Sequence, residues 1–189
     1  GVPPDAFTVQ GQLWGNPLYD WQGHREDVFS FWRERIAWCA RLFDAVRIDH
    51  FRAFHSYWSV PTQAVSAKEG HWEPGPGMDL LEVLRAQAPD LELIAEDLGD
   101  LGPEALEFVR TCGVPGMKVM VFAFDPGVEG AYLPHNCWGN CVVYTSTHDT
   151  PTFVQWLTQA PAGWARFARD YLRLREEEGL GWGVISGAW

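Results

Sequence analysis

The chain has 189 residues, of which 25 are acidic and 14 are basic, so its formal net charge is −11. A surface this acidic repels phosphate backbones, so nucleic acid is not an expected partner. Hydrophobic residues make up 47% and charged residues 21% of the chain, which excludes a disordered segment and allows a large core. No run of about 18 apolar residues occurs, so no membrane span is expected.

The first 25 residues predict an irregular loop, and the rest of the chain alternates between strand and helix patterns. This alternation predicts an α/β fold, with a parallel sheet and helices outside it. No glycine-rich phosphate-binding motif follows a strand, which weakens a nucleotide-binding interpretation. In chain order the predicted elements are a helix at 27–43, a strand at 44–49, a long loop at 56–77, a helix at 78–87, a strand at 91–97, a helix at 103–112, strands at 117–124 and 141–149, helices at 151–159 and 162–178, and an ambiguous tail at 179–189.

Four cysteines are too few, in a chain of this length, to suggest a disulfide scaffold. Reduced thiols in a cytoplasmic protein are the better interpretation. Cys137 and Cys141 are separated by three residues, with only His135 close by and no second cysteine pair. Structural zinc needs about four such ligands, so no metal site is expected.

Three of the four predicted strands end in acidic residues: Asp49, Glu96 and Asp149. In a parallel barrel the carboxyl ends of all strands open on one face, and that face holds the active site. Carboxylates that converge repel one another, so one stays ionised while another can keep its proton. Glycoside chemistry needs such a pair, a nucleophile and an acid. The pattern therefore favours a barrel enzyme with an acidic site.

Strand periodicity refines this hypothesis. Arg47 and Asp49 share one face of their strand, while Val46 and Ile48 face the outer helices. A cation beside Asp49 favours the ionised form that a nucleophile needs. Glu96 follows three apolar residues, and partial burial would raise its pKa, as a general acid requires. The alternative is that the carboxylates are helix caps or solvated loop residues and that Arg47 and Asp49 form a plain structural ion pair.

Several segments, in this order, resemble the 4-α-glucanotransferases, the amylomaltase or disproportionating-enzyme family related to the α-amylases. The resemblance covers nearly the whole chain to about residue 157. It rests on GVPPDAF (1–7), GQLWGNPLYDW (11–21), RIDHFRAF (47–54), YWSVP (57–61), GHWEPGPG (70–77), LIAEDLG (93–99), PGMKVMVFAFD (115–125), YLPHN (132–136) and YTSTHDT (144–150). The chain departs from the usual family pattern at Ser146 and Thr150, where glycine and asparagine are more common, and at Gly130–Ala131, where an Asn-Pro pair is often found.

The resemblance implies a (β/α)8 TIM barrel with inserted subdomains. The whole chain would be a catalytic barrel segment holding about strands 4 to 7, with residues 1–25 as a substrate loop and 26–189 as βα units. By this resemblance the N- and C-terminal parts of the barrel would be missing. The chain also opens at Gly1, not Met, and stops at Trp189 in mid-pattern, so both ends look cut. We therefore expect a piece of a longer protein.

The resemblance also implies a mechanism and its residues. The expected reaction moves a segment of an α-1,4-glucan to a new 4-hydroxyl by a retaining double displacement, on maltodextrins or glucose as partners and with no cofactor. Asp49 resembles the nucleophile, Glu96 the general acid/base and Asp149 the third carboxylate. Arg47 and His148 match family residues that hold the nucleophile and the bound sugar. Trp14 matches an aromatic residue of the substrate loop, and Asn136 is expected to orient a loop near the substrate.

Transfer of a glucan segment requires that a sugar acceptor, and not water, react with the intermediate. Aromatic side chains in loops can exclude water from such a site. His50 follows the nucleophile, points to the other side of the strand and is expected to be structural. The aromatic candidates are Trp14, Tyr19, Tyr57, Trp58, Trp72 and Trp138.

Two rival hypotheses remain. One is an α-glucan hydrolase that uses the same carboxylates. The other is a non-catalytic glucan-binding module, or a fragment that cannot fold alone and aggregates through exposed sheet edges.

Overall fold

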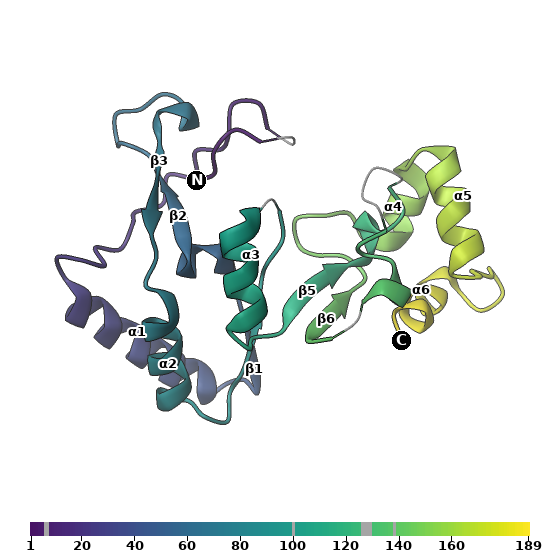
Figure 1. The fold of residues 1–189 in the computed structure, drawn as a ribbon. Helices are drawn as coiled ribbons and strands as arrows, with labels where there is room; N and C mark the ends of the chain where they lie inside the picture. The colour runs from purple at the N-terminus through teal and green to yellow at the C-terminus, as the bar shows by residue number, and fades with distance from the viewer. Residues whose placement is uncertain (6–7, 100, 126–129, 138) are drawn as a thin grey trace. The chain divides into compact units, whose positions relative to one another are not determined.

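The computed structural model describes residues 1–189 except 6–7, 100, 126–129 and 138 (Figure 1). The chain divides into two compact units, Gly1–Val114 and Pro115–Trp189, and each has its own strands and helices. Among the described helices, none is long and apolar enough to cross a membrane.

The first unit alternates strands and helices, as the sequence predicts. Strands β1 and β4 pair in parallel, with Val46 opposite Leu93 and Ile48 opposite Ala95. The connection between them carries a hairpin and a helix, which is the kind of long crossover that parallel strands need. The elements are α1 (Arg25–Ala40), β1 (Ala45–Ile48), η1 (Phe51–Phe54), β2 (Ser56–Ser59), η2 (Ala67–Glu69), β3 (His71–Pro74), α2 (Gly77–Gln87), β4 (Glu92–Ala95) and α3 (Gly102–Thr111).

The core of the first unit forms where α1, α2 and α3 cover β1 and β4. Phe51 lies at its centre, fully buried, and its ring stacks on Phe54 at 4.6 Å between centroids. Ile48 and Val46 pack into this core, which confirms the predicted outward face of β1. Removal of these side chains from water is the main contribution to the stability of this unit.

Residues 56–77 do not form the long loop that the sequence predicts. Strands β2 and β3 pair as an antiparallel hairpin, with Trp58 directly opposite Trp72. The two indole rings meet edge to face at 5.1 Å, a cross-strand pair of the kind that stabilises a short hairpin. Each strand is only four residues long, so the alternation is too brief to detect in the sequence.

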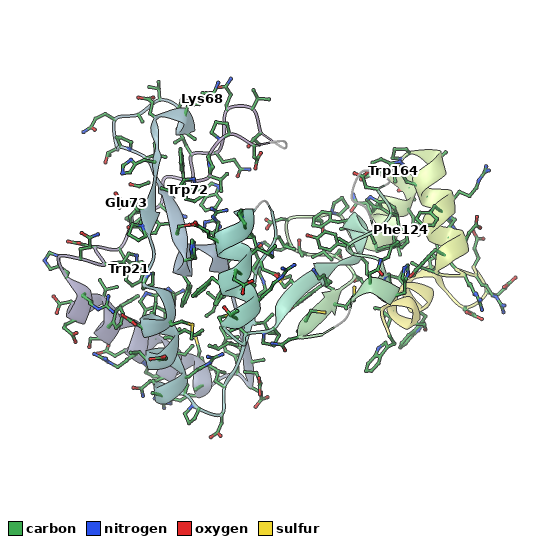
Figure 2. The ribbon with its side chains drawn as sticks, viewed as in Figure 1. Trp21, Lys68, Trp72, Glu73, Phe124 and Trp164 are labelled. Carbon is green, nitrogen blue, oxygen red and sulfur yellow. The ribbon has the colours of Figure 1, made fainter. Side chains whose placement is uncertain are left out.

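The second unit contains a second parallel pair, β5 and β6, with Val119 opposite Tyr144. Its core gathers around Phe124, which is fully buried and is labelled in Figure 2. Four aromatic rings surround Phe124, those of Phe153, Trp156, Phe167 and Tyr171. The elements are β5 (Gly116–Val119), η3 (Met120–Phe122), η5 (Pro134–Asn136), β6 (Cys141–Tyr144), α4 (Phe153–Gln159), α5 (Ala162–Tyr171) and α6 (Leu180–Ala188).

Several predicted boundaries are wrong. The strand predicted at 117–124 ends at Val119, because the chain turns into η3, whose Met120 and Val121 are buried. The helix predicted at 162–178 ends at Tyr171, since Arg173 adopts a left-handed conformation (φ 52°) that no helix continues through. The ambiguous tail forms helix α6, and α1 ends at Ala40 instead of residue 43.

The strand predicted at 141–149 is also too long, because β6 ends at Tyr144. The following hydroxyl-bearing residues form a hydrogen-bonded turn instead of a continued ladder. Thr150 Oγ1 accepts from the backbone N–H of Thr147 at 2.8 Å. Threonine side chains offer the backbone such local partners and so compete with strand pairing. Asp149 therefore lies in a turn beyond the strand and not at its last position.

Candidate active site

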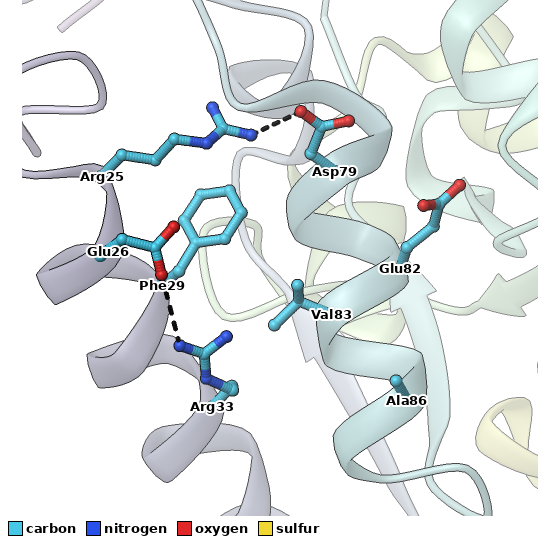
Figure 3. A pocket seen from close by; sticks show the side chains of 8 residues that line it. All are labelled: Arg25, Glu26, Phe29, Arg33, Asp79, Glu82, Val83 and Ala86. Carbon is cyan, nitrogen blue, oxygen red and sulfur yellow. Dashed lines mark hydrogen bonds and ion pairs between the residues drawn. The ribbon is translucent and has the colours of Figure 1, made fainter.

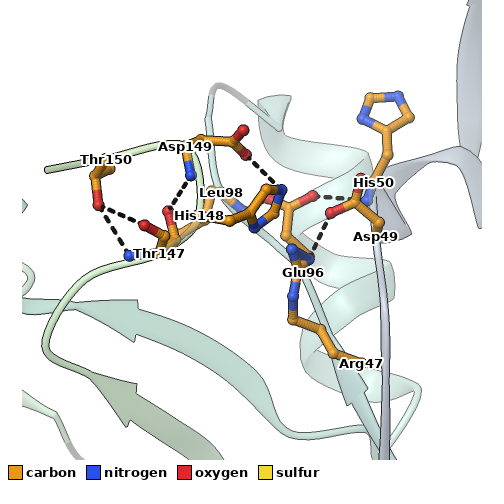
Figure 4. A network of polar contacts seen from close by, with 9 residues as sticks. All are labelled: Arg47, Asp49, His50, Glu96, Leu98, Thr147, His148, Asp149 and Thr150. Carbon is orange, nitrogen blue, oxygen red and sulfur yellow. Dashed lines mark hydrogen bonds and ion pairs between the residues drawn. The ribbon is translucent and has the colours of Figure 1, made fainter. Parts of the chain in front are cut away.

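Asp49 and Glu96 follow the last residues of two paired strands. Ile48 of β1 and Ala95 of β4 are register partners, so the parallel ladder brings the next residue of each strand to the same edge. Two backbone hydrogen bonds extend the ladder through this point: Glu96 N–H donates to Ile48 O, and Phe51 N–H donates to Glu96 O, both at 3.0 Å. The sequence prediction that these two carboxylates meet at one edge of the sheet is confirmed (Figure 4).

Arg47 holds Asp49 in one orientation. Arg47 Nη1 donates to Oδ1 of Asp49 at 2.5 Å. Such a charge-assisted hydrogen bond is among the stronger ones in proteins. Only 22% of the Arg47 side chain is exposed, against 73% of that of Asp49. The carboxylate is therefore oriented by a largely buried cation and remains accessible to a ligand.

Both carboxylate oxygens of Glu96 are held by the backbone. Oε2 accepts from the N–H of His50 at 2.7 Å, and Oε1 accepts from the N–H of Leu98 at 3.0 Å. Burial raises the pKa of Glu96 above its ordinary value, and the negative charge of Asp49 adds to the rise. The two hydrogen bonds and Arg47 oppose the rise without cancelling it. A raised pKa suits a group that must give and take a proton near neutral pH, as the sequence predicts.

His50 is the residue that sequence reasoning undervalued. Its backbone is left-handed (φ 48°, ψ 48°), which is uncommon outside glycine. Burial lowers the pKa of its imidazole; nearby positive charges, including Arg52, act in the same direction, and Asp49 opposes them. The sequence offers only one weak signal for this backbone conformation, the tolerance of histidine for the left-handed region.

Two of the aromatic candidates lie against the turn that follows Asp49. The ring of Trp14 meets the ring of His50 edge to face at 5.0 Å. Trp72, labelled in Figure 2, lies under the guanidinium of Arg52, which is 3.9 Å from its ring centroid. Residues 50–52 thus anchor one tryptophan from the N-terminal segment and one from the hairpin.

The other aromatic candidates have different surroundings. Tyr19 packs on Trp21 and Trp32 and so fixes the N-terminal segment to α1. Trp58 Nε1 donates to Ala67 O at 2.8 Å, inside the hairpin connection. Tyr57 lies in β2 and is half-buried. Trp138 lies outside the described residues.

The remaining predicted residues belong to the second unit. His148 and Asp149 lie in the turn after β6, where His148 Nε2 is 3.1 Å from Asp149 Oδ2 and the N–H of Asp149 donates to Thr147 Oγ1 at 3.3 Å (Figure 4). Asn136, in η5, donates through Nδ2 to Gly130 O at 3.0 Å and so braces its own loop. The convergence of Asp149 with the carboxylates of the first unit stays a prediction.

A metal-binding cluster and a surface pocket are two other kinds of candidate site. The described residues include no group of three or more histidine, cysteine or acidic side chains that could hold a metal ion. A pocket between α1 and α2 carries ion pairs from Arg25 to Asp79 and from Arg33 to Glu26 (Figure 3). None of the predicted site residues lines this pocket.

Comparison with known proteins decides the family. A family model described as 4-alpha-glucanotransferase matches residues 1–189. The chain belongs to the 4-alpha-glucanotransferase family. This confirms the resemblance drawn from the sequence motifs.

Individual members of the family agree with this assignment. The 4-alpha-glucanotransferase of Clostridium butyricum is 47% identical over 190 residues, which cover 100% of this chain and 39% of that protein. The enzyme of the same name from Thermus thermophilus is 43% identical over 192 residues, 98% of this chain and 38% of that protein. The chain therefore spans about two fifths of the length of these relatives.

A solved structure supports the fold. The amylomaltase from Streptococcus agalactiae in complex with acarbose superposes with a TM-score of 0.86 at 35% identity, over 99% of this chain and 38% of that one. The chain is thus a partial α/β structure with the fold of the corresponding part of a 4-alpha-glucanotransferase.

Proposed function

We propose that the chain is the catalytic segment of a 4-α-glucanotransferase, which moves part of an α-1,4-glucan to the 4-hydroxyl of another glucan. The observation that carries the proposal is the pair at the edge of β1 and β4: an accessible Asp49 oriented by Arg47, beside a half-buried Glu96 of raised pKa. Two carboxyl groups in different environments are what retaining glycoside chemistry requires.

The first half of the reaction breaks the donor glucan. Asp49 attacks the anomeric carbon and forms a covalent glycosyl ester, while Glu96 delivers its proton to the departing glycosidic oxygen. The raised pKa of Glu96 favours the protonated form that this step consumes. Arg47 keeps the Asp49 carboxylate aimed during the attack.

The second half forms the new bond. Glu96, now ionised, takes the proton of the acceptor 4-hydroxyl, and that oxygen attacks the anomeric carbon and releases Asp49. Two inversions at one carbon restore the α configuration. We assign Asp149 and His148 to hydrogen bonds with sugar hydroxyls that strengthen in the transition state, and Asn136 to the loop near the substrate. Both chemical steps are carried by carboxyl groups, so the proposal requires no cofactor.

The finer points of architecture are also proposals. We infer that the parallel pairs β1–β4 and β5–β6 contribute to about strands 4 to 7 of a (β/α)8 barrel, with residues 1–25 as its substrate loop. Their parallel pairing and the intervening helices support this inference. All four cysteines are free thiols, which supports a cytoplasmic location.

The substrate class follows from the family and from the aromatic residues. Acarbose is bound by the amylomaltase to which the structure is similar. Trp14 and Trp72 present partly exposed rings beside the turn that follows Asp49. Such rings can bind maltodextrins and exclude water, so that a glucan acceptor wins over hydrolysis.

Product analysis with maltotriose tests the proposal. We expect the chain to convert maltotriose into glucose and longer maltodextrins, and the Asp49→Asn variant to form neither. Asn is nearly isosteric with Asp but a poor nucleophile. Asp44→Asn is the matched control, since it makes the same change just before the other end of β1, and it should leave the products unchanged.

The other outcomes are equally informative. Glucose and maltose without longer chains would replace transfer by hydrolysis. Equal activity in the parent and in Asp49→Asn would overturn the role of Asp49. An absence of products from the parent would show that these 189 residues are not an enzyme by themselves.

A further inference from the structure

His50 makes two contacts that link the proposed acid/base to the N-terminal segment: its backbone N–H donates to Glu96, and its ring packs against Trp14. We propose that His50 is a positioning residue: its left-handed backbone orients the Glu96 carboxyl group, and its imidazole holds the ring of Trp14 against the same turn. The catalytic part of this inference rests on the proposed function, in which Glu96 is the acid/base. Both contacts of His50 can be tested without a glucan.

The backbone contact depends on an uncommon conformation. With φ 48° and ψ 48°, the chain reverses just after Asp49, and the His50 N–H is 2.7 Å from Glu96 Oε2. A left-handed residue other than glycine persists only where its surroundings impose it, and such residues cluster at functional sites. Because the Leu98 N–H holds the other oxygen, the carboxyl group is fixed at both oxygens and cannot rotate freely.

The ring contact uses the side chain of the same residue. The rings of His50 and Trp14 are nearly perpendicular, at 84°, with centroids 5.0 Å apart. Burial lowers the pKa of His50, so the imidazole is neutral at neutral pH and packs as an aromatic ring. Trp14 is fixed at its other end by a hydrogen bond from Nε1 to Gln12 Oε1 at 2.9 Å.

The consequence is a connection between substrate loop and acid/base. Trp14 lies within the segment proposed to bind glucan, and Glu96 is the proposed proton donor. His50 contacts both Glu96 and Trp14. Displacement of Trp14 is therefore expected to shift the backbone of His50 as well. The charged groups that act on this pair are Asp49 and Arg47 on Glu96, and the N-terminal amino group, Arg52 and Asp49 on His50.

Nuclear magnetic resonance tests the backbone contact in the unaltered fold. We expect the amide proton of His50 to move downfield as pH rises, because its hydrogen bond strengthens when Glu96 ionises. The midpoint of this shift should equal the midpoint of the titration of the Glu96 carboxyl carbon. In Glu96→Gln this transition should vanish from the His50 amide, whereas Glu92→Gln, a control in the same strand β4, should retain it. A His50 amide that ignores the Glu96 midpoint would overturn the backbone half of the proposal.

Two substitutions separate the backbone from the ring. Asn tolerates left-handed backbone, whereas the β-branched Val does not. His50→Asn should therefore leave the titration midpoint of the Glu96 carboxyl unchanged. His50→Val should raise that midpoint by on the order of 1 pH unit, because the hydrogen bond from the residue-50 N–H to Glu96 is lost. If His50→Val does not fold, the amide titration above still decides the backbone contact.

The ring contact has its own readout. With fluorotryptophan incorporated and the Trp14 resonance assigned through Trp14→Phe, His50→Asn should shift that resonance even though Glu96 titrates normally. An unchanged Trp14 resonance would overturn the ring half. Failure of glucan transfer would contradict the proposed function and leave these glucan-free results standing, so the two failures are distinguishable.

Discussion

Arg47 and Asp49 lie two residues apart at the end of β1, and the guanidinium donates to the carboxylate at 2.5 Å. The cation is largely buried and the anion largely exposed. The protein therefore holds Arg47 in place, and Arg47 holds Asp49. Because a guanidinium is planar and directs its donors, this restraint depends on geometry as well as on charge.

Replacement of Arg47 should therefore harm the reaction more than the fold. We expect Arg47→Lys to lower the rate of maltotriose disproportionation by roughly 100-fold, since the lysine keeps the charge but loses the planar donor that aims Asp49. The melting temperature should change little, because an ion pair with one exposed partner contributes at most about 1 kcal/mol. Arg41→Lys is the control, because Arg41 is exposed and lies just after the last residue of α1. A full rate in Arg47→Lys would mean that only the positive charge is needed.

Glu96 should make the stability of the first unit depend on pH. Its pKa in the folded state is raised above the unfolded value, so the folded state binds the proton more tightly than the unfolded state. The favourable contribution is complete below the unfolded pKa and is lost as pH rises through the folded pKa. The melting temperature of the parent, relative to that of Glu96→Gln, should therefore fall as pH rises from 4 to 7.5. The comparison is between pH values because the Gln side chain has a single acceptor oxygen for the two backbone N–H groups that Glu96 binds. Equal differences at both pH values would contradict this.

The core of the first unit should depend strongly on Phe51. Its side chain is fully buried and stacks on Phe54 and Phe108, so Phe51→Ala leaves a cavity that the neighbours only partly fill. We expect a loss of about 3–5 kcal/mol in the free energy of unfolding by urea. Phe43→Ala makes the same change at an exposed position and should cost no more than about 0.5 kcal/mol.

The regular elements could be predicted from the sequence because their signals are local. Pro89 follows α2, and Pro103 stands at the first turn of α3, and both act within a few residues. The hairpin could not be predicted in this way. Its strands are four residues long and pair across η2 and the connection around it, and the pairing of Trp58 with Trp72 appears only once the chain is folded.

The candidate site divides in the same manner. Arg47 and Asp49 share a face by strand periodicity, and the burial of Glu96 follows from its apolar neighbours, so both could be predicted. The proposed role of His50 could not be predicted, because it depends on a backbone N–H and a left-handed φ, and neither leaves a distinct signal in the sequence. The turn that carries Asp149 differs from the predicted strand because the hydroxyl groups of Thr147 and Thr150 bond to the backbone in place of a neighbouring strand.

Gly75 should tolerate no side chain. A Cβ there would lie 2.1 Å from the carbonyl oxygen of Ala53 and 2.3 Å from that of Phe54, and backbone atoms cannot move aside cheaply. Gly75→Ala should therefore lower the unfolding free energy of the first unit by about 1–3 kcal/mol. Gly163→Ala is the matched control: its Cβ meets nothing within 4 Å, and in helix α5 it should stabilise by about 0.5–1 kcal/mol. Equal effects in thermal melts would refute the steric explanation.

Trp14 should decide how often water competes with the sugar acceptor. Its ring is held at the turn after Asp49 by His50 and Gln12, and 42% of the residue is exposed. Trp14→Leu removes an aromatic face that can stack on a glucan and shield the glycosyl ester, so the ratio of longer maltodextrins to hydrolysis products should fall several-fold. Quantitative chromatography of maltotriose digests measures this ratio directly. Trp38→Leu, an exposed tryptophan on α1, should leave the ratio unchanged; a fall in both variants would mean that loss of any surface tryptophan is enough.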